Sequence, residues 1–100
     1  MTDKELLEKA AKAAGIEILY WSEISEGFKL KNVLVYWNPL TDDGDALRLA
    51  VKLGLQVSER VSEVWRDGKE TAYFFEDDVD PYAATRRAIV RAAAEIGKTL

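Results

Sequence analysis

The chain contains no cysteine and no histidine among its 100 residues. Without cysteine there is no disulfide, no thiolate metal site and no cysteine nucleophile. Without histidine, most hydrolytic and zinc-dependent chemistries lose their commonest general base and metal ligand. The remaining polar residues form no P-loop, no GxGxxG and no GxSxG motif. We therefore expect no cofactor and favour a function other than catalysis.

Long apolar runs and a basic excess are also missing. No stretch approaches the roughly 20 apolar residues that a membrane span needs, and residues 1–5 lack the apolar segment of a signal peptide. The net charge is −4, whereas proteins that follow phosphate backbones usually carry a basic excess. These absences predict a protein of the reducing cytosol without membrane contact, and they make nucleic acid a disfavoured partner.

What the chain does contain is typical of one globular unit. It is 48% hydrophobic and 32% charged, which is the composition of a folded protein with a modest core. We expect a single domain over residues 1–100.

Three segments carry apolar residues at helical spacing. The first opens with a capping box formed by Thr2 and Glu5, and the last opens with Asp80 as N-cap and Pro81 at the first helical position. The predicted helices cover residues 2–14, a segment from 41 or 42 to 53, and residues 80–96, and each is followed by a glycine that would end it: Gly15, Gly54 and Gly97.

The segments between the predicted helices are rich in β-branched and aromatic residues. Residues 16–21 and 33–37 are predicted strands, and the polar stretch 22–31 between them is a predicted loop. Residues 55–76 predict a hairpin that turns at Asp67 and Gly68. The resulting order is α-β-β-α-β-β-α, which predicts an α+β fold of two layers with three helices packed on a small, mostly antiparallel sheet.

Asp42, Asp43 and Asp45 lie at the start of the second predicted helix. Their carboxylates could bind a cation or act as an acid–base pair, but acidic side chains in a first turn also cap N–H groups and complement the helix dipole. A second acidic group precedes the last helix and consists of Asp77, Asp78 and Asp80. If the two helix starts converged, the carboxylates would repel one another without a cation. Capping is the favoured interpretation of both groups.

The last predicted helix has a basic side formed by Arg86, Arg87, Arg91 and Lys98. These side chains could contact an anion, a nucleic acid or an acidic partner. The favoured interpretation is a solvated face that balances the acidic remainder of the chain.

The second predicted strand ends at Trp37, and Asn38, Pro39 and Leu40 follow it. An exposed tryptophan at this corner would suit a recognition surface, whereas a buried one would fasten the strand to a helix. The second interpretation is favoured. Trp21 and Trp65 present the same choice more weakly.

Residues 37–50 (WNPLTDDGDALRLA) and 84–93 (ATRRAIVRAA) resemble blocks of small, uncharacterised phage and prophage proteins. The segment from Ala10 to Gly15 is similar to the end of their first helix, and the overall plan resembles that of the phage NinX-type proteins. The resemblance implies an accessory protein of a mobile element that acts in the cytosol of a bacterial host. Because it carries no assigned activity, no catalytic residue is transferred.

Three hypotheses follow from the sequence. The first is a non-enzymatic module that binds a host or phage protein, the second is a nucleic-acid- or nucleotide-associated protein, and the third is a metal-assisted enzyme that uses the aspartate clusters. The candidate binding residues are Trp37, Asn38, Pro39, Asp42, Asp43, Asp45, Arg86, Arg87 and Arg91.

Overall fold

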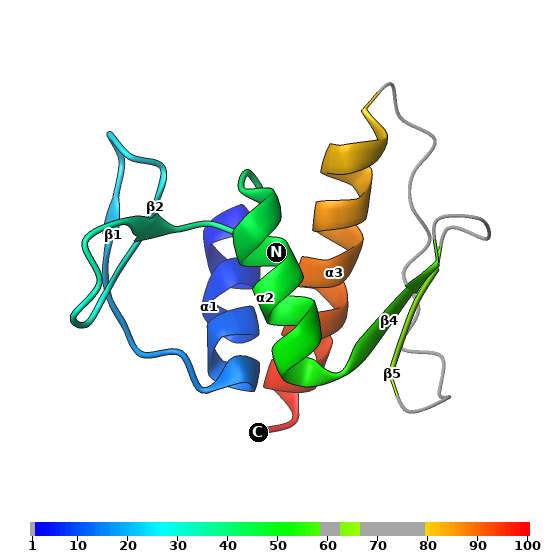
Figure 1. The fold of residues 1–100 in the computed structure, drawn as a ribbon. Coiled ribbons are helices and arrows are strands. Elements are labelled where there is room, and N and C mark those ends of the chain that lie inside the picture. The colour runs from blue at the N-terminus through cyan, green and yellow to red at the C-terminus, as the bar shows by residue number, and fades with distance from the viewer. Residues whose placement is uncertain (1, 59–62, 67–79) are drawn as a thin grey trace.

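The computed structural model describes residues 2–58, 63–66 and 80–100 of the chain. Within them the order of elements is α1 (Asp3–Ala14), β1 (Ile18–Ser22), β2 (Gly27–Leu30), β3 (Tyr36–Trp37), α2 (Asp43–Leu53), β4 (Leu55–Ser58), β5 (Glu63–Arg66) and α3 (Pro81–Lys98) (Figure 1). The predicted α+β class, with three helices and antiparallel strands, is confirmed. The predicted order is also present, with β2 as an additional strand.

The three helices lie side by side and run in the same direction (Figure 1). Arg87, near the start of α3, bonds to Asp3 at the start of α1, and Lys12 near the end of α1 donates to the carbonyl of Leu100 just beyond α3. The positive ends of the three helix dipoles therefore gather at one end of the molecule.

The interface between α1 and α3 is built from small residues. Its buried members include Ala10, Ala11, Ala14, Ala88, Ala92, Ala93 and Gly97. Gly97 packs directly on the α1 backbone, since a Cβ added there would lie 2.0 Å from the carbonyl oxygen of Lys9. The prediction that Gly97 ends the last helix is wrong, because α3 continues to Lys98. Gly15 and Gly54 do end α1 and α2 as predicted, in the left-handed conformation.

The first sheet has the order β1-β2-β3 and is antiparallel. The prediction of a loop over residues 22–31 is wrong at Gly27–Leu30, which forms β2. The strand is only four residues long, its burial does not alternate, since Gly27 and Phe28 are both buried, and it pairs with β1 at Lys29 opposite Tyr20. The predicted strand 33–37 shortens to Tyr36–Trp37, and residues 33–35 lie outside the sheet.

The second sheet pairs β4 with β5, from Leu55 opposite Arg66 to Ser58 opposite Glu63. The sequence predicts that these residues form one arm of a longer hairpin, and that prediction is wrong because β4 and β5 are two antiparallel strands that pair with each other. The turn predicted at 67–68 and the second arm at 72–75 lie outside the described residues.

One hydrophobic core joins the helices to both sheets. Its larger buried side chains include Leu7, Phe28, Trp37, Leu49, Val64, Ile89 and Val90. The core thus fixes the corner after β3 against the start of α2, which positions the candidate residues described next. Within the described residues, no helix is both long enough and apolar enough to cross a bilayer.

Candidate functional site at the helix starts

The corner between β3 and α2 is buried. Trp37, Asn38 and Pro39 are each less than 10% exposed. The Asn38 amide donates from Nδ2 to the carbonyl of Glu26 at 2.6 Å and accepts at Oδ1 from the N–H of Leu40 at 2.9 Å. The second bond closes a turn of the kind that asparagine favours before a proline-containing corner. These three residues therefore hold the corner together and do not present an exposed recognition surface.

The carboxylate of Asp45 is buried in this corner and fully engaged. Its Oδ2 accepts from the backbone N–H of Asn38 at 2.9 Å, and its Oδ1 accepts from Arg48 at 2.7 Å. Asp42 caps α2 by accepting the N–H of Asp45 at 2.8 Å. Asp42 therefore caps the helix as the capping interpretation expects, whereas Asp45 serves a backbone donor of the corner before the helix.

Arg86 joins the start of α2 to α3. Its Nη1 donates to Asp43 at 2.7 Å and its Nε donates to the carbonyl of Leu40 at 2.8 Å, with only 16% of the side chain exposed. The guanidinium thus satisfies a corner carbonyl and a first-turn carboxylate at once.

Arg87 joins α3 to the start of α1 through a two-point contact with Asp3, at 3.0 and 3.1 Å. This hydrogen bonding lowers the pKa of the Asp3 carboxyl below 3.8; partial burial opposes the shift, and the charges of Arg87 and Arg91 assist it. The basic side of α3 therefore neutralises acidic residues at the starts of α1 and α2. Two of its three arginines, Arg86 and Arg87, pair in this way with carboxylates of the same chain.

The structure brings most of the predicted site residues together. Those that meet at the corner and the start of α2 are Trp37, Asn38, Pro39, Asp42, Asp43, Asp45 and Arg86, whereas Arg87 and Arg91 act on the start of α1. Asp80 caps α3, and Asp77 and Asp78 lie outside the described residues. Across residues 2–58, 63–66 and 80–100 no three acidic side chains gather to hold a metal ion.

Several aliphatic side chains are exposed on and around the sheet β1-β2-β3, and the sequence did not predict their exposure. Four of them, here called the sheet-end residues, are more than half exposed: Leu19, Ile24, Leu34 and Val35. Ile24 (98% exposed) sits in the turn between β1 and β2, and Leu34 (95%) lies in the connection before β3. The predicted strand over residues 33–37 placed Leu34 and Val35 within the sheet, whereas in the structure both lie outside it and are exposed. Figure 1 shows this sheet on the far side of α1 from β4 and β5.

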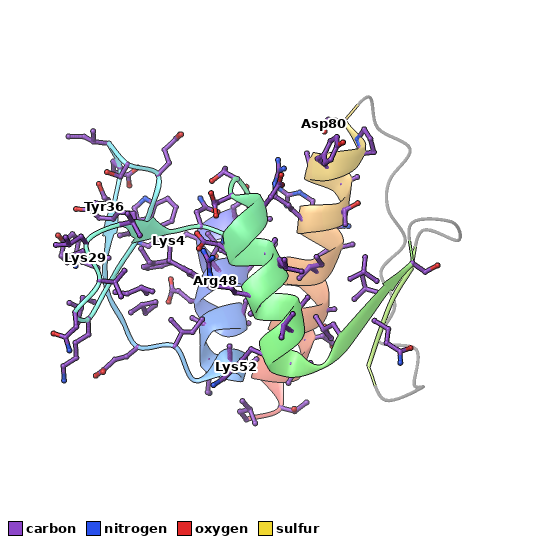
Figure 2. All side chains as sticks on the ribbon, in the orientation of Figure 1. Lys4, Lys29, Tyr36, Arg48, Lys52 and Asp80 are labelled. Carbon is purple, nitrogen blue, oxygen red and sulfur yellow. The ribbon has the colours of Figure 1, made fainter. Side chains whose placement is uncertain are left out.

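Hollows border α2 on the side of α1 and on the side of α3. One, of about 480 Å³, lies between α2, the end of α1 and the first sheet. The other, of about 610 Å³, lies between α2 and α3 and is lined mainly by apolar residues, among them Leu47, Ala50 and Ile89. Figure 2 shows the side chains of α2, with Arg48 and Lys52 labelled on the side that faces α1.

Comparisons of the chain with protein-family models, with curated proteins and with solved structures gave no match.

Proposed function

We propose that this protein is a non-enzymatic protein-binding module that acts in the cytosol of a bacterial host as an accessory protein of a phage or prophage. The resemblance of residues 37–50 and 84–93 to phage proteins motivates the setting. The observation that carries the binding function is the exposure of the sheet-end residues.

In a free monomer, the contact of the sheet-end residues with water is unfavourable in free energy. Exposed aliphatic groups are destabilised by contact with water by roughly 25 cal/mol for each Å². Leu34 and Val35 are neighbours in the chain, and adjacent exposed aliphatic side chains of this kind mark interaction surfaces. Val35 and Leu34 precede β3, which is an edge strand of the three-stranded sheet. An edge strand next to exposed aliphatic residues suits a partner that adds a strand and covers the side chains.

The charged residues support this function over its alternatives. Arg86 and Arg87 each bind a carboxylate of the same chain, so binding to nucleic acid would have to replace these internal pairs. The carboxylates of Asp42 and Asp45 serve backbone N–H groups at the start of α2, so a metal-assisted reaction would have to release them. Neither alternative is favoured by a specific contact in the structure.

The test is photo-crosslinking in bacterial cells that carry the source phage or prophage. A photoreactive amino acid at position 34 is compared with the same amino acid at position 47, where Leu47 is also exposed (64%) but lies on α2. We expect one defined protein to be crosslinked from position 34, to be absent from position 47, and to be lost when Val35→Asp is added beside position 34.

Two results would contradict the proposal. Identical crosslinked products from positions 34 and 47 would indicate non-specific capture of apolar surfaces. Crosslinking of position 34 only to a second copy of this chain would indicate self-association in place of a distinct partner.

A further inference from the structure

The hollow between α2, the end of α1 and the first sheet results from how the sheet ends. β3 contributes only Tyr36 and Trp37 to the ladder, so residues 33–35 do not extend the sheet over the space beside α2. On the opposite side α1 ends in the small residues Ala14 and Gly15, which also line the hollow. The volume of about 480 Å³ lies within the range of small-molecule sites, about 300–1,000 Å³.

The walls of the hollow are mainly apolar. Ile16, Leu30, Trp37 and Leu49 approach it from the chain after α1, from β2, from β3 and from α2. Protein interiors leave few voids of this size, and water in contact with such walls is unfavourable. An apolar ligand body would replace that water with dispersion contacts.

The rim of the hollow on α2 is cationic. Arg48 and Lys52 lie one turn apart on the same helix face, on the side that faces α1 (Figure 2). Arg48 donates one bond to Asp45 and lies 3.9 Å from the carboxylate of Asp42, yet its side chain is 73% exposed, and a guanidinium has five N–H donors. In the described part of the chain, Lys52 forms no hydrogen bond or ion pair with another residue.

The one carboxylate on the lining does not neutralise the positive charge of this rim. Asp45 is the one carboxylate among the lining residues, and it already accepts from the N–H of Asn38 as well as from Arg48. Lys52 therefore provides a charge without a counter-ion on the described lining, next to an apolar wall. This arrangement complements a ligand that combines an apolar body with one negative charge.

We propose that the hollow binds a small amphipathic carboxylate, with the apolar body against Leu49 and Trp37 and the carboxylate at Lys52 and Arg48. The site goes beyond the proposed protein-binding function and does not rest on it.

The test is a titration of the ¹⁵N-labelled full chain with decanoate, followed by amide chemical shifts, in parallel with decanol as the uncharged ligand of the same length. We expect saturable shifts at Gly15, Leu30 and Leu49 with decanoate, at concentrations below its micelle formation. Lys52→Glu replaces an attraction by a repulsion at the rim and should weaken decanoate binding about five-fold or more, while decanol binding stays unchanged.

Lys4→Glu is the matched control, because it changes the net charge equally at an exposed position at the start of α1. It should leave the affinity for decanoate as in the unmodified chain. Absence of saturable shifts, shifts confined to the groove between α2 and α3, or equal weakening by Lys4→Glu and Lys52→Glu would each overturn the assignment. Equal affinity for decanoate and decanol would overturn the anionic part of it.

Discussion

Replacing Gly97 by alanine should destabilise this protein, although the same change stabilises most helices. Alanine is up to about 1 kcal/mol more favourable than glycine within a helix, and Gly97 lies in the last turn of α3. The new methyl group, however, would lie 2.0 Å from the carbonyl oxygen of Lys9 and 2.8 Å from its carbonyl carbon. Cβ atoms essentially never approach other heavy atoms more closely than 3.0 Å, so α1 and α3 would have to separate by about 1 Å.

The size of the expected loss of stability follows from the contacts that α1 and α3 would lose on separating. The atoms in the way are backbone atoms of α1, which cannot move aside as the end of a side chain can. A radial gap of 0.5–1 Å already forfeits about a quarter to a half of a contact's dispersion energy, and overpacking in cores typically costs about 1–3 kcal/mol. Setting the upper part of that range against the gain in helix propensity, we expect a net loss of about 2 kcal/mol in the free energy of unfolding.

Denaturant-induced unfolding followed by circular dichroism measures this loss, and thermal unfolding should show a midpoint lower by about 8–16 °C for a chain of this size. Gly44→Ala is the control: it is the same substitution in a helix, but there the added Cβ would meet only the side-chain ends of Arg48 and Asp42 at 3.2 Å. We expect Gly44→Ala to change stability by no more than about 0.5 kcal/mol. A Gly97→Ala protein as stable as the unmodified chain would refute the close approach of α3 to α1.

Three further predictions concern the helix-start end. Asn38→Ala leaves the N–H of Leu40 and a carbonyl without their partners and should lower the free energy of unfolding by about 2 kcal/mol; unchanged unfolding in urea would contradict the buried corner. Arg86→Lys keeps the charge but loses the Nε donor to Leu40, so we expect a loss of about 1 kcal/mol in the same assay, with Arg86→Ala losing more. The pKa of Asp3 is lowered by its bond to Arg87, so its contribution to stability is present above pH 3.8 and is lost as the pH falls through the lowered value. An NMR titration of Arg87→Ala should show the pKa of Asp3 returning toward 3.8, and an unchanged value would refute the pairing.

The sequence predicted the helices well because their signals are local. Thr2, Asp42 and Asp80 cap the helices as expected, since a capping side chain needs only a backbone N–H two or three residues away. Gly97 was misjudged for the opposite reason. A glycine that permits a left-handed end and a glycine that permits close packing look alike in sequence, and only the position of Lys9 on another helix separates them.

The strands were predicted less well because they are short and depend on partners. Gly27–Leu30 has too few residues for alternation to stand out, yet it becomes the central strand because β1 and β3 supply partners on both sides. Gly27 itself is suited to this place, since a Cβ there would lie 3.1 Å from the carbonyl oxygen of Trp37. The exposure of Leu34 could not be predicted for the same reason, because the residue at which β3 begins to pair depends on its partner strand and not on its own sequence.

The candidate site shows why a distinctive sequence block does not by itself indicate a binding surface. The block at residues 37–50 drew attention through its tryptophan, its proline and its aspartates, and the structure uses these residues to close the corner onto α2. The Asp45 carboxylate accepts from the backbone N–H of Asn38, and the Asn38 side chain bonds to Glu26 and Leu40. Asp43 accepts from Arg86 of the second similar block. A protein that shares both blocks would therefore share this corner and its link to α3, while remaining free to differ at the sheet-end residues. If binding resides in the sheet-end residues, proteins similar in these blocks would share the fold and choose different partners.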